Sequence, residues 1–273
     1  MQLGVNVPNF GPGTDPGVLR EWARTVEGLG FDLLMVSDHV ASTPDVAQRY
    51  PAPFYEPFTT LSWLAGITDR VRLGTTVLVL PYRHPLLVAR MAANLQQLSG
   101  GRLVLGVGVG WARQEFEALG VPFTARGRLT DEALDVLREV WRAEDGGNGI
   151  PVPLWVGGSS EAAIRRAVRV GDAWHPLRST LPWLRTTLAG HPDLPVFAPR
   201  IALRLTDTAI DDPERLAGTG TLEQVLDDLD QLRLLGAETV LLDPYHGDPQ
   251  ETRRPQAAWR ALSAVATHWR TAP

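Results

Sequence analysis

Short apolar runs alternate with longer segments of helical periodicity along this chain, and this alternation restricts the folds available to it. In the first long segment, Leu19, Trp22 and Val26 fall on one helical face. Strands that alternate with helices form parallel sheets, and eight such units in 273 residues predict a single α/β domain, a (β/α)8 TIM barrel over residues 1–273. The predicted strands are residues 3–7, 33–36, 71–80, 103–107, 154–156, 173–175, 201–205 and 239–242. The polar segment 144–151 reads as a flexible linker.

The composition excludes several functional classes. A formal net charge of −5 argues against a nucleic-acid partner, and the lack of cysteine excludes disulfide and thiolate chemistry. All 26 basic residues are arginine, so lysine Schiff-base chemistry is excluded and an anion site must use arginine, backbone N–H groups or hydroxyls. No apolar stretch approaches the ~20 residues of a membrane span, and the N-terminus lacks signal-peptide features. We expect a cytoplasmic protein with no membrane partner.

The run FDLLMVSDH at residues 31–39 ends abruptly in Asp38 and His39. Its apolar part is typical of a strand buried on both faces. Catalytic groups of α/β barrels lie where such strands end. A carboxylate beside an imidazole at that point predicts a proton-handling pair, with a loop cap and a surface histidine as the alternative.

Three further strand ends carry small or glycine-rich sequence. Thr75, Thr76 and Val77 lie in the third predicted strand, where a flat ring can approach the backbone or where strand propensity alone explains them. The turn GVGVGW ends in Gly108, Val109, Gly110 and Trp111, which either admit a cofactor or form a bulge. The turn WVGGSS ends in Gly157, Gly158, Ser159 and Ser160, which predict a phosphate site at a helix N-terminus, assisted by Arg165 or Arg166, or a plain helix cap.

Five residues are assigned to a substrate pocket. The alternative for Glu56 is a first-turn carboxylate of a helix, and the alternative for Trp174 and His175 is barrel packing. The remaining histidines show no metal-binding spacing, and there is no G-x-S-x-G motif, so no metal site and no serine hydrolase is expected. The assigned residues are Phe10, Glu56, Trp111, Trp174 and His175.

Taken together, these motifs resemble the luciferase-like monooxygenase superfamily of flavin and deazaflavin oxidoreductases. The matching segments are SDH at 37–39, RLGTTVLVLPYRHP at 72–85, LSGGRLVLGVGVGW at 98–111, EFEALGVPF at 115–123 and WVGGSSEAAIRRAVRVGDAWHP at 155–176. The fold of that family is a (β/α)8 barrel. The version of the glycine-rich turn found here is most similar to the branch that uses the deazaflavin coenzyme F-420.

The resemblance implies where such a cofactor lies. Its ring would stack on the strand 75–77, with a non-proline cis peptide between Thr76 and Val77, and residues 108–111 would flank it. Residues 157–160 would hold the tail phosphate. Hydride transfer at the ring would be accompanied by a proton moved by His39, which Asp38 would orient unless Asp38 contacts the ring itself.

Two departures from the family pattern narrow the range of expected substrates. Sugar-phosphate dehydrogenases of the family carry a glutamate where this chain has Trp111, and they use lysines that this chain lacks, so glucose-6-phosphate oxidation is not expected. A small organic substrate and a homodimer are expected from the resemblance. The alternative activity is an FMN-dependent monooxygenase supplied by a partner flavin reductase, and a third reading is a non-catalytic barrel.

Overall fold

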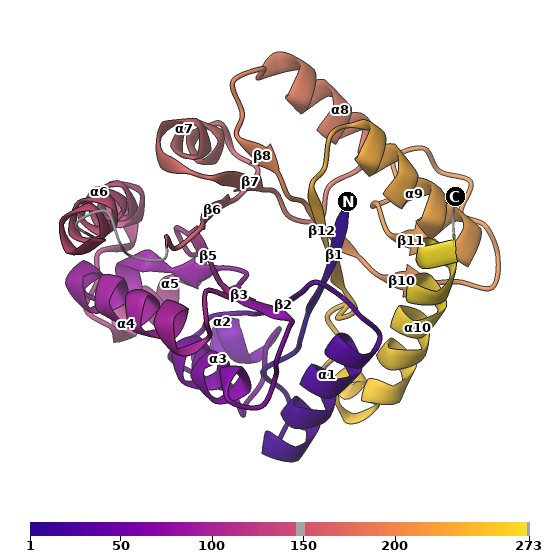
Figure 1. Cartoon of the computed structure of the whole chain (residues 1–273), viewed down its shortest axis with the longest axis horizontal. Coiled ribbons are helices and arrows are strands. Elements are labelled where there is room, and N and C mark those ends of the chain that lie inside the picture. Colours follow the sequence, from indigo (N-terminus) through magenta and orange to yellow (C-terminus); the bar gives the residue numbers. More distant parts are fainter. Residues whose placement is uncertain (146–150, 272–273) are drawn as a thin grey trace.

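A ring of parallel strands forms the centre of the molecule in a computed structural model that describes residues 1–145 and 151–271. Figure 1 looks along this ring, with the strands inside and the helices outside. Most of the predicted linker 144–151 lies outside the described residues. The strands of the ring are β1 (Gln2–Asn6), β2 (Leu33–Val36), β3 (Arg72–Thr75), β4 (Leu78–Val79), β5 (Leu103–Gly108), β6 (Leu154–Gly157), β7 (Ala173–His175), β8 (Val196–Phe197), β9 (Arg200–Ala202) and β12 (Thr239–Asp243).

The strand register closes the ring. Gly4 of β1 is paired with Leu33 of β2 on one side and with Leu241 of β12 on the other. The segment from β8 to β9 closes the far side, because β8 pairs with β7 and β9 pairs with β12. With β3–β4 and β8–β9 each counted as one interrupted strand, the predicted (β/α)8 barrel is confirmed.

Helices cover the outside of the ring because each presents an apolar stripe to the strands. In α1, the Asp15 side chain accepts a hydrogen bond from the Val18 amide and Pro16 begins the helix, while Leu19, Trp22 and Val26 are buried. The helices are α1 (Pro16–Gly28), α2 (Pro44–Ala47), α3 (Pro57–Ala65), α4 (Pro85–Leu98), α5 (Arg113–Ala118), α6 (Arg126–Asp145), α7 (Glu161–Val170), α8 (Leu181–Gly190), α9 (Leu222–Leu234) and α10 (Pro255–Thr271), with 3-10 turns η1 (Leu80–Tyr82), η2 (Phe123–Ala125) and η3 (Pro249–Arg253).

Two predicted strands differ from those observed. The run 71–80 is interrupted between β3 and β4, and the peptide bond from Thr76 to Val77 is cis, as predicted. The run 201–205 starts too late, because the barrel strand is the segment 196–202. Beyond it, β10 (Arg204–Leu205) pairs with β11 (Thr219–Gly220) in a separate two-stranded sheet.

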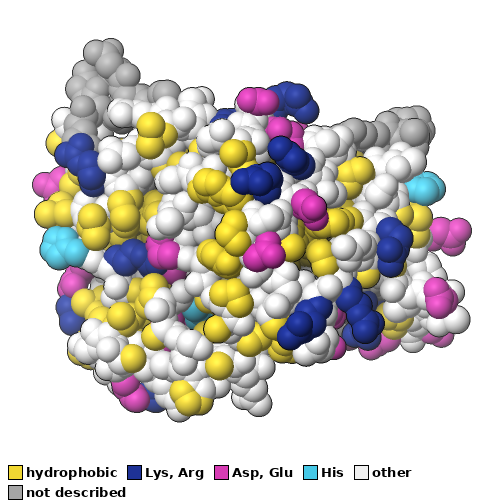
Figure 2. Space-filling model, turned by 90° about the horizontal axis from the view of Figure 1, so that it is seen from below, with side chains coloured by type: hydrophobic (Ala, Val, Ile, Leu, Met, Phe, Trp, Pro, Cys, Tyr) yellow, Lys and Arg dark blue, Asp and Glu magenta, His cyan; other side chains and the backbone are white. Residues whose placement is uncertain are grey.

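Polar residues interrupt the apolar interior at the carboxyl ends of the strands. Asn6 of β1, Asp243 of β12 and Arg200 of β9 are all buried there. On the face drawn in Figure 2, acidic and basic side chains are interspersed among apolar ones. No helix in the described part of the chain is long and apolar enough to cross a membrane.

Candidate active site

A pocket of about 250 Å³ opens where the strands from β2 to β7 end. This is the edge at which α/β barrels place their chemistry. Most of the site residues predicted from the sequence lie around it. Those lining the pocket are Asp38, His39, Thr76, Val77, Gly108, Val109, Gly110, Trp111, Gly157, Gly158 and His175, together with Ser37, Tyr50, Val79, Leu177 and Arg200.

The partner of His39 is Glu115 of α5. Its Oε2 atom lies 2.7 Å from His39 Nδ1 and also accepts a hydrogen bond from the Tyr82 hydroxyl at 2.7 Å. Its Oε1 atom accepts hydrogen bonds from the backbone amides of Val40 and Ala41. Burial by itself raises the pKa of Glu115, but His39 and these donors outweigh it and lower the pKa below its ordinary value. A fully buried carboxylate therefore stays ionised beside the imidazole.

Asp38 does not orient His39, which corrects that expectation. Its carboxylate forms a bidentate pair with Arg83, at 2.7 and 2.8 Å, and accepts the Val79 amide at 2.9 Å. Burial raises the pKa of Asp38, and the Arg83 guanidinium opposes that rise. Asp38 thus ties the end of β4 and the segment after η1 to the end of β2.

Aromatic rings surround the His39 imidazole. The Tyr50 ring stacks on it with a centroid distance of 5.2 Å, and the rings of Phe54 and Trp111 meet it edge-on at 5.3 and 5.6 Å. Trp111 is 42% exposed and forms the outer edge of the pocket. These rings give the imidazole side of the pocket an apolar wall.

The glycines on the opposite side make room for the interrupted strand. A Cβ on Gly108 or Gly157 would lie 2.6 Å from a methyl group of Val77, and one on Gly106 would lie 2.0 Å from the Thr75 carbonyl oxygen. The bare backbone of these glycines therefore accommodates the segment 75–77, as the packing interpretation held. Val77 itself is the side chain that faces the pocket between them.

A buried network of hydrogen bonds and ion pairs lies beneath the pocket. Arg200 donates to Asp243 at 2.7 Å through Nη2 and to the Thr76 carbonyl at 2.8 Å through Nη1, and Asn6 donates to Asp243 at 3.0 Å. Burial alone raises the pKa of Asp243, but Arg200 and Asn6 outweigh it and hold the pKa below its ordinary value. The network fixes the carbonyl at the break between β3 and β4.

His175 belongs to the same network. Its Nε2 lies 3.0 Å from the Thr76 hydroxyl, and its Nδ1 contacts the Ala198 carbonyl. Burial lowers the pKa of His175 to about 4. The imidazole is therefore neutral at neutral pH, donates from Nδ1 and accepts the Thr76 hydroxyl proton at Nε2.

Six predicted site residues do not line the pocket: Thr75, Trp174, Phe10, Glu56, Ser159 and Ser160. Thr75 is buried and donates its hydroxyl to the Gly106 carbonyl at 2.6 Å. Trp174 points outward to the helix layer, where its indole N–H donates to the Gly158 carbonyl and its ring contacts Phe197. Phe10 is buried against other aromatic rings, including Phe54 at 5.4 Å.

Glu56 caps α3 and only indirectly reaches the site. Its Oε2 accepts the Thr59 amide at 2.7 Å, while its Oε1 accepts from Arg83 at 3.0 Å. The first-turn interpretation of Glu56 therefore holds, and the substrate-pocket assignment does not. Glu56 thus places a second carboxylate against Arg83, the arginine that pairs with Asp38.

The predicted phosphate segment lies at the start of α7. The Ser160 hydroxyl accepts the Ala163 amide at 3.3 Å, so Ser160 is the helix cap, and Ser159 is exposed beside it. Arg166 does not face this turn, because it pairs with Asp131 of α6 at 2.8 Å. Arg165 is exposed and pairs with Glu161 at 3.9 Å.

Sequence reasoning missed Glu115, Arg83 and Arg200. Glu115 begins the quoted EFEALGVPF run, which was the available signal, and the structure shows its side chain buried next to Phe116. Arg83 lies within the quoted RLGTTVLVLPYRHP run. In the part of the chain that the structure describes, no group of three or more His, Cys, Asp or Glu side chains is placed to hold a metal ion.

A parallel barrel with a histidine and a strand break at its carboxyl edge places this chain among the α/β barrels, whose active sites lie at that edge. The family model for luciferase-like monooxygenases matches residues 1–188, so the chain belongs to that family. An uncharacterized protein of Mycobacterium tuberculosis is 31% identical over 180 residues, covering 56% of this chain and 62% of that protein. The F-420-dependent glucose-6-phosphate dehydrogenase of Beutenbergia cavernae is 35% identical over 182 residues, covering 58% and 52%. The chain thus spans about half to three fifths of the length of these relatives.

Solved structures share the fold over nearly the whole chain. The monooxygenase RslO1 from Streptomyces bottropensis superposes with a TM-score of 0.75 at 18% identity, covering 98% of this chain and all of that one. The FMN complex of the oxygenating constituent of 3,6-diketocamphane monooxygenase from Pseudomonas putida gives 0.74 at 16% identity, covering 97% of both chains. At these identities the likeness concerns the fold alone.

Proposed function

We propose that this protein is an oxidoreductase that transfers a hydride between coenzyme F-420 and a small organic substrate, with His39 moving the accompanying proton. The observation that carries the proposal is the contact between His39 Nδ1 and the buried Glu115 carboxylate. Because Glu115 occupies Nδ1, Nε2 is the ring nitrogen that remains for proton exchange at the pocket. The adjacent negative charge stabilises the imidazolium after His39 takes up a proton.

The residues present fit a planar ring held between two walls. One wall is the segment 76–77 with the bare backbone of Gly108 and Gly157, and the other carries His39 and Tyr50. A volume of about 250 Å³ is below the roughly 300–1,000 Å³ of pockets that enclose a whole ligand, so only the ring portion would be enclosed. The tail would run along residues 157–160, where the N-terminus of α7 and the exposed Ser159 suit a phosphate.

F-420 would supply the hydride chemistry, and the protein would supply position and a proton path. Val77 would support one face of the ring, and Trp111 would limit the access of water from the outside. The F-420-dependent relative supports this choice of cofactor, since it is 35% identical over 182 residues. The absence of lysine keeps a sugar phosphate outside the proposed substrates.

The second candidate is an FMN-dependent monooxygenase, which the match to the family of luciferase-like monooxygenases favours. It would require reduced flavin from a partner reductase, and the aromatic wall formed by Tyr50, Phe54 and Trp111 would exclude water from the ring. The two candidates differ in their reaction with oxygen, because a monooxygenase consumes it. A homodimer and a cytoplasmic location remain predictions under either activity.

Parallel fluorescence titrations of the purified protein with F-420 and with FMN test the proposal. We expect F-420 to bind at least tenfold more tightly, and Gly157→Val, which adds a branched side chain against Val77, to abolish that binding. A preference for FMN together with oxygen uptake would replace the proposal with the monooxygenase. Failure of both cofactors to bind would contradict both candidates.

A further inference from the structure

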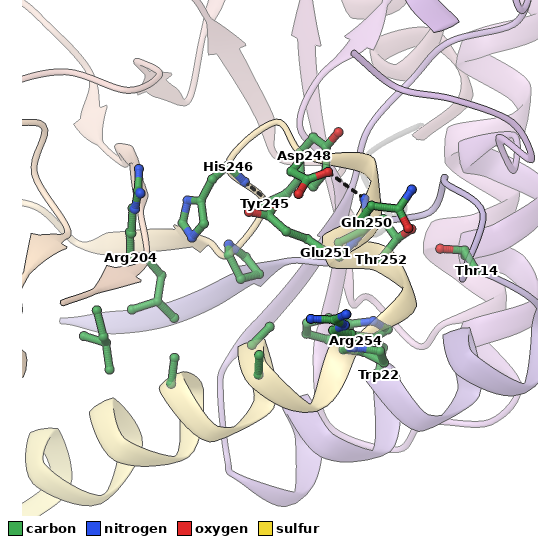
Figure 3. Close-up of a pocket in the computed structure, with 18 residues that line it drawn as sticks. Thr14, Trp22, Arg204, Tyr245, His246, Asp248, Gln250, Glu251, Thr252 and Arg254 are labelled. Atoms are coloured by element: carbon green, nitrogen blue, oxygen red, sulfur yellow. Dashed lines mark hydrogen bonds between the residues drawn. The ribbon is translucent and has the colours of Figure 1, made fainter. Parts of the chain in front are cut away.

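A second and larger cavity lies beside α10, on the other side of the barrel edge. Its volume is about 600 Å³, and we call it the α10 cavity. It lies between β10, the loop that follows β12 and the first turns of α10 (Figure 3). The residues that give it an apolar floor are Trp22, Leu203, Leu205, Pro255, Ala258 and Ala261.

An aromatic partition separates the α10 cavity from the pocket at His39. Tyr245 lines the α10 cavity, and its ring contacts Phe10 at 4.8 Å and Tyr50 at 5.9 Å. Tyr50 lines the other pocket, on the far side of this contact. The two cavities therefore have different walls, and a molecule in one does not occupy the other.

The acidic side chains at the α10 cavity are already engaged. Glu251 accepts the His246 amide at 2.8 Å, and Asp248 accepts the Gln250 amide at 2.9 Å. Burial raises the pKa of Glu251, and the His246 amide and the Arg204 charge oppose that rise. Both carboxylates thus serve to fold the loop 244–251 over the cavity.

Arg204, unlike these carboxylates, is exposed, and within residues 1–143 and 151–269 no carboxylate forms an ion pair with its guanidinium. Figure 3 shows Arg204 beside His246 at one end of the cavity, with Arg254 toward the other. Burial, and the nearby Arg204 charge, lower the pKa of His246, so the imidazole there is neutral. Arg204 supplies the positive charge at that end of the cavity.

We propose that the α10 cavity is a second ligand site, which binds a small molecule with an apolar body and one carboxylate group. The carboxylate pairs with the Arg204 guanidinium, and the apolar body lies on Trp22 and the alanines of α10. The volume is within the roughly 300–1,000 Å³ of small-molecule sites. The combination of an apolar floor and the exposed Arg204 guanidinium at one end favours an amphipathic anion over a sugar, a nucleotide or a cation.

Calorimetric titration with octanoate and with octanol, an uncharged molecule of the same chain length, tests this site. We expect octanoate to bind at least fivefold more tightly than octanol, because a charge-assisted hydrogen bond is added to the same apolar contact. Arg204→Gln should remove that preference. Ala258→Phe, which fills the floor of the cavity, should remove binding of both probes.

Two matched variants locate the anion. Arg254→Gln changes the guanidinium at the other end of the cavity, and Arg233→Gln changes an arginine of α9 that pairs with Asp230 outside it. Both should keep the octanoate preference, and circular dichroism checks that all variants are folded. Equal affinity for octanoate and octanol, a loss in Arg254→Gln instead of Arg204→Gln, or no binding of either probe would each overturn the proposal. F-420 titration of Arg204→Gln should match the unmodified protein, so failure here is separate from failure at His39.

Discussion

Glu115 and His39 lie 76 positions apart in the sequence, and their side chains meet at 2.7 Å beneath the pocket. The carboxylate fixes which imidazole nitrogen carries the proton and places a negative charge beside it. It also holds the backbone of Val40 and Ala41. Glu115 is therefore a positioning residue that acts through His39.

Replacing Glu115 by glutamine keeps its size and removes its charge. We expect turnover to fall by about a hundredfold, the lower end of the range typical of general acid–base catalysis, with little change in cofactor affinity. Steady-state kinetics beside a cofactor titration would measure this. The control is Glu117→Gln, which changes an exposed glutamate of the same helix and should leave turnover as it was.

Replacing His39 by glutamine should reduce turnover by a similar or larger factor and largely preserve cofactor affinity. The amide fills the space beside Tyr50 and Trp111 but does not exchange protons near neutral pH. Single-turnover absorbance of the bound cofactor would report the step directly. Unchanged turnover would remove His39 from the proton path.

A Cβ at position 108 should disturb the strand break. Gly108→Ala places that atom 2.6 Å from Val77 Cγ2, and we expect a loss of about 1–3 kcal/mol in the free energy of unfolding, the range for an overpacked core. Adding Val77→Ala should recover part of the loss, which urea denaturation would measure. Gly28→Ala, where nothing lies within 4 Å of the added atom, is the neutral control.

The two serines before α7 should respond differently to alanine. Ser160→Ala removes the helix cap and should cost about 1 kcal/mol of stability. Ser159→Ala removes an exposed hydroxyl and should weaken cofactor binding without changing the melting temperature. If Ser159→Ala leaves cofactor affinity unchanged, the phosphate assignment at this turn is wrong.

Lowering the pH should reduce the stability of the folded protein, because Asp243 becomes protonated. Its pKa is lowered from an ordinary value of 3.8, so its contribution to stability is complete above that value and is lost as the pH falls through the lower, folded-state pKa. Asp243→Asn leaves Arg200 buried without its partner and should cost about 3–5 kcal/mol at pH 7. Urea denaturation from pH 7 to pH 3 should show a smaller acid dependence in this variant than in the exposed control Asp230→Asn.

The sequence predicts the barrel and the edge at which the site lies, because both follow from periodicity. It does not predict which side of a strand faces inward. Trp174 and His175 are neighbours in β7, and successive side chains point to opposite faces, so only one of them reaches the interior. Both sides of a barrel strand are buried, and hydropathy alone does not distinguish them.

Contacts between distant segments account for the other differences between the predicted and the observed site. Asp38 and His39 are adjacent in sequence, yet their side chains pair with Arg83 and Glu115 on separate elements. Gly108 is predicted to flank a cofactor ring and Gly157 to hold its phosphate, and in the packed barrel the room beside both is occupied by the Val77 side chain. Only the packed barrel shows which neighbour occupies that space.

Because Glu115 anchors Val40 and Ala41, the loop that follows β2 has two parts, residues 39–41 and residues 42–54. Residues 39–41 are held by Glu115, and the following stretch to Phe54 supplies the Tyr50 and Phe54 rings that face the imidazole. That second stretch has its own anchors, because Asp45 bonds to Gln114 of α5 and the Arg49 carbonyl accepts the Tyr245 hydroxyl. A loop grafted from a relative onto residues 42–54 would therefore alter the shape seen by a substrate, and leave the imidazole and its counter-charge in register, only if it keeps these two contacts.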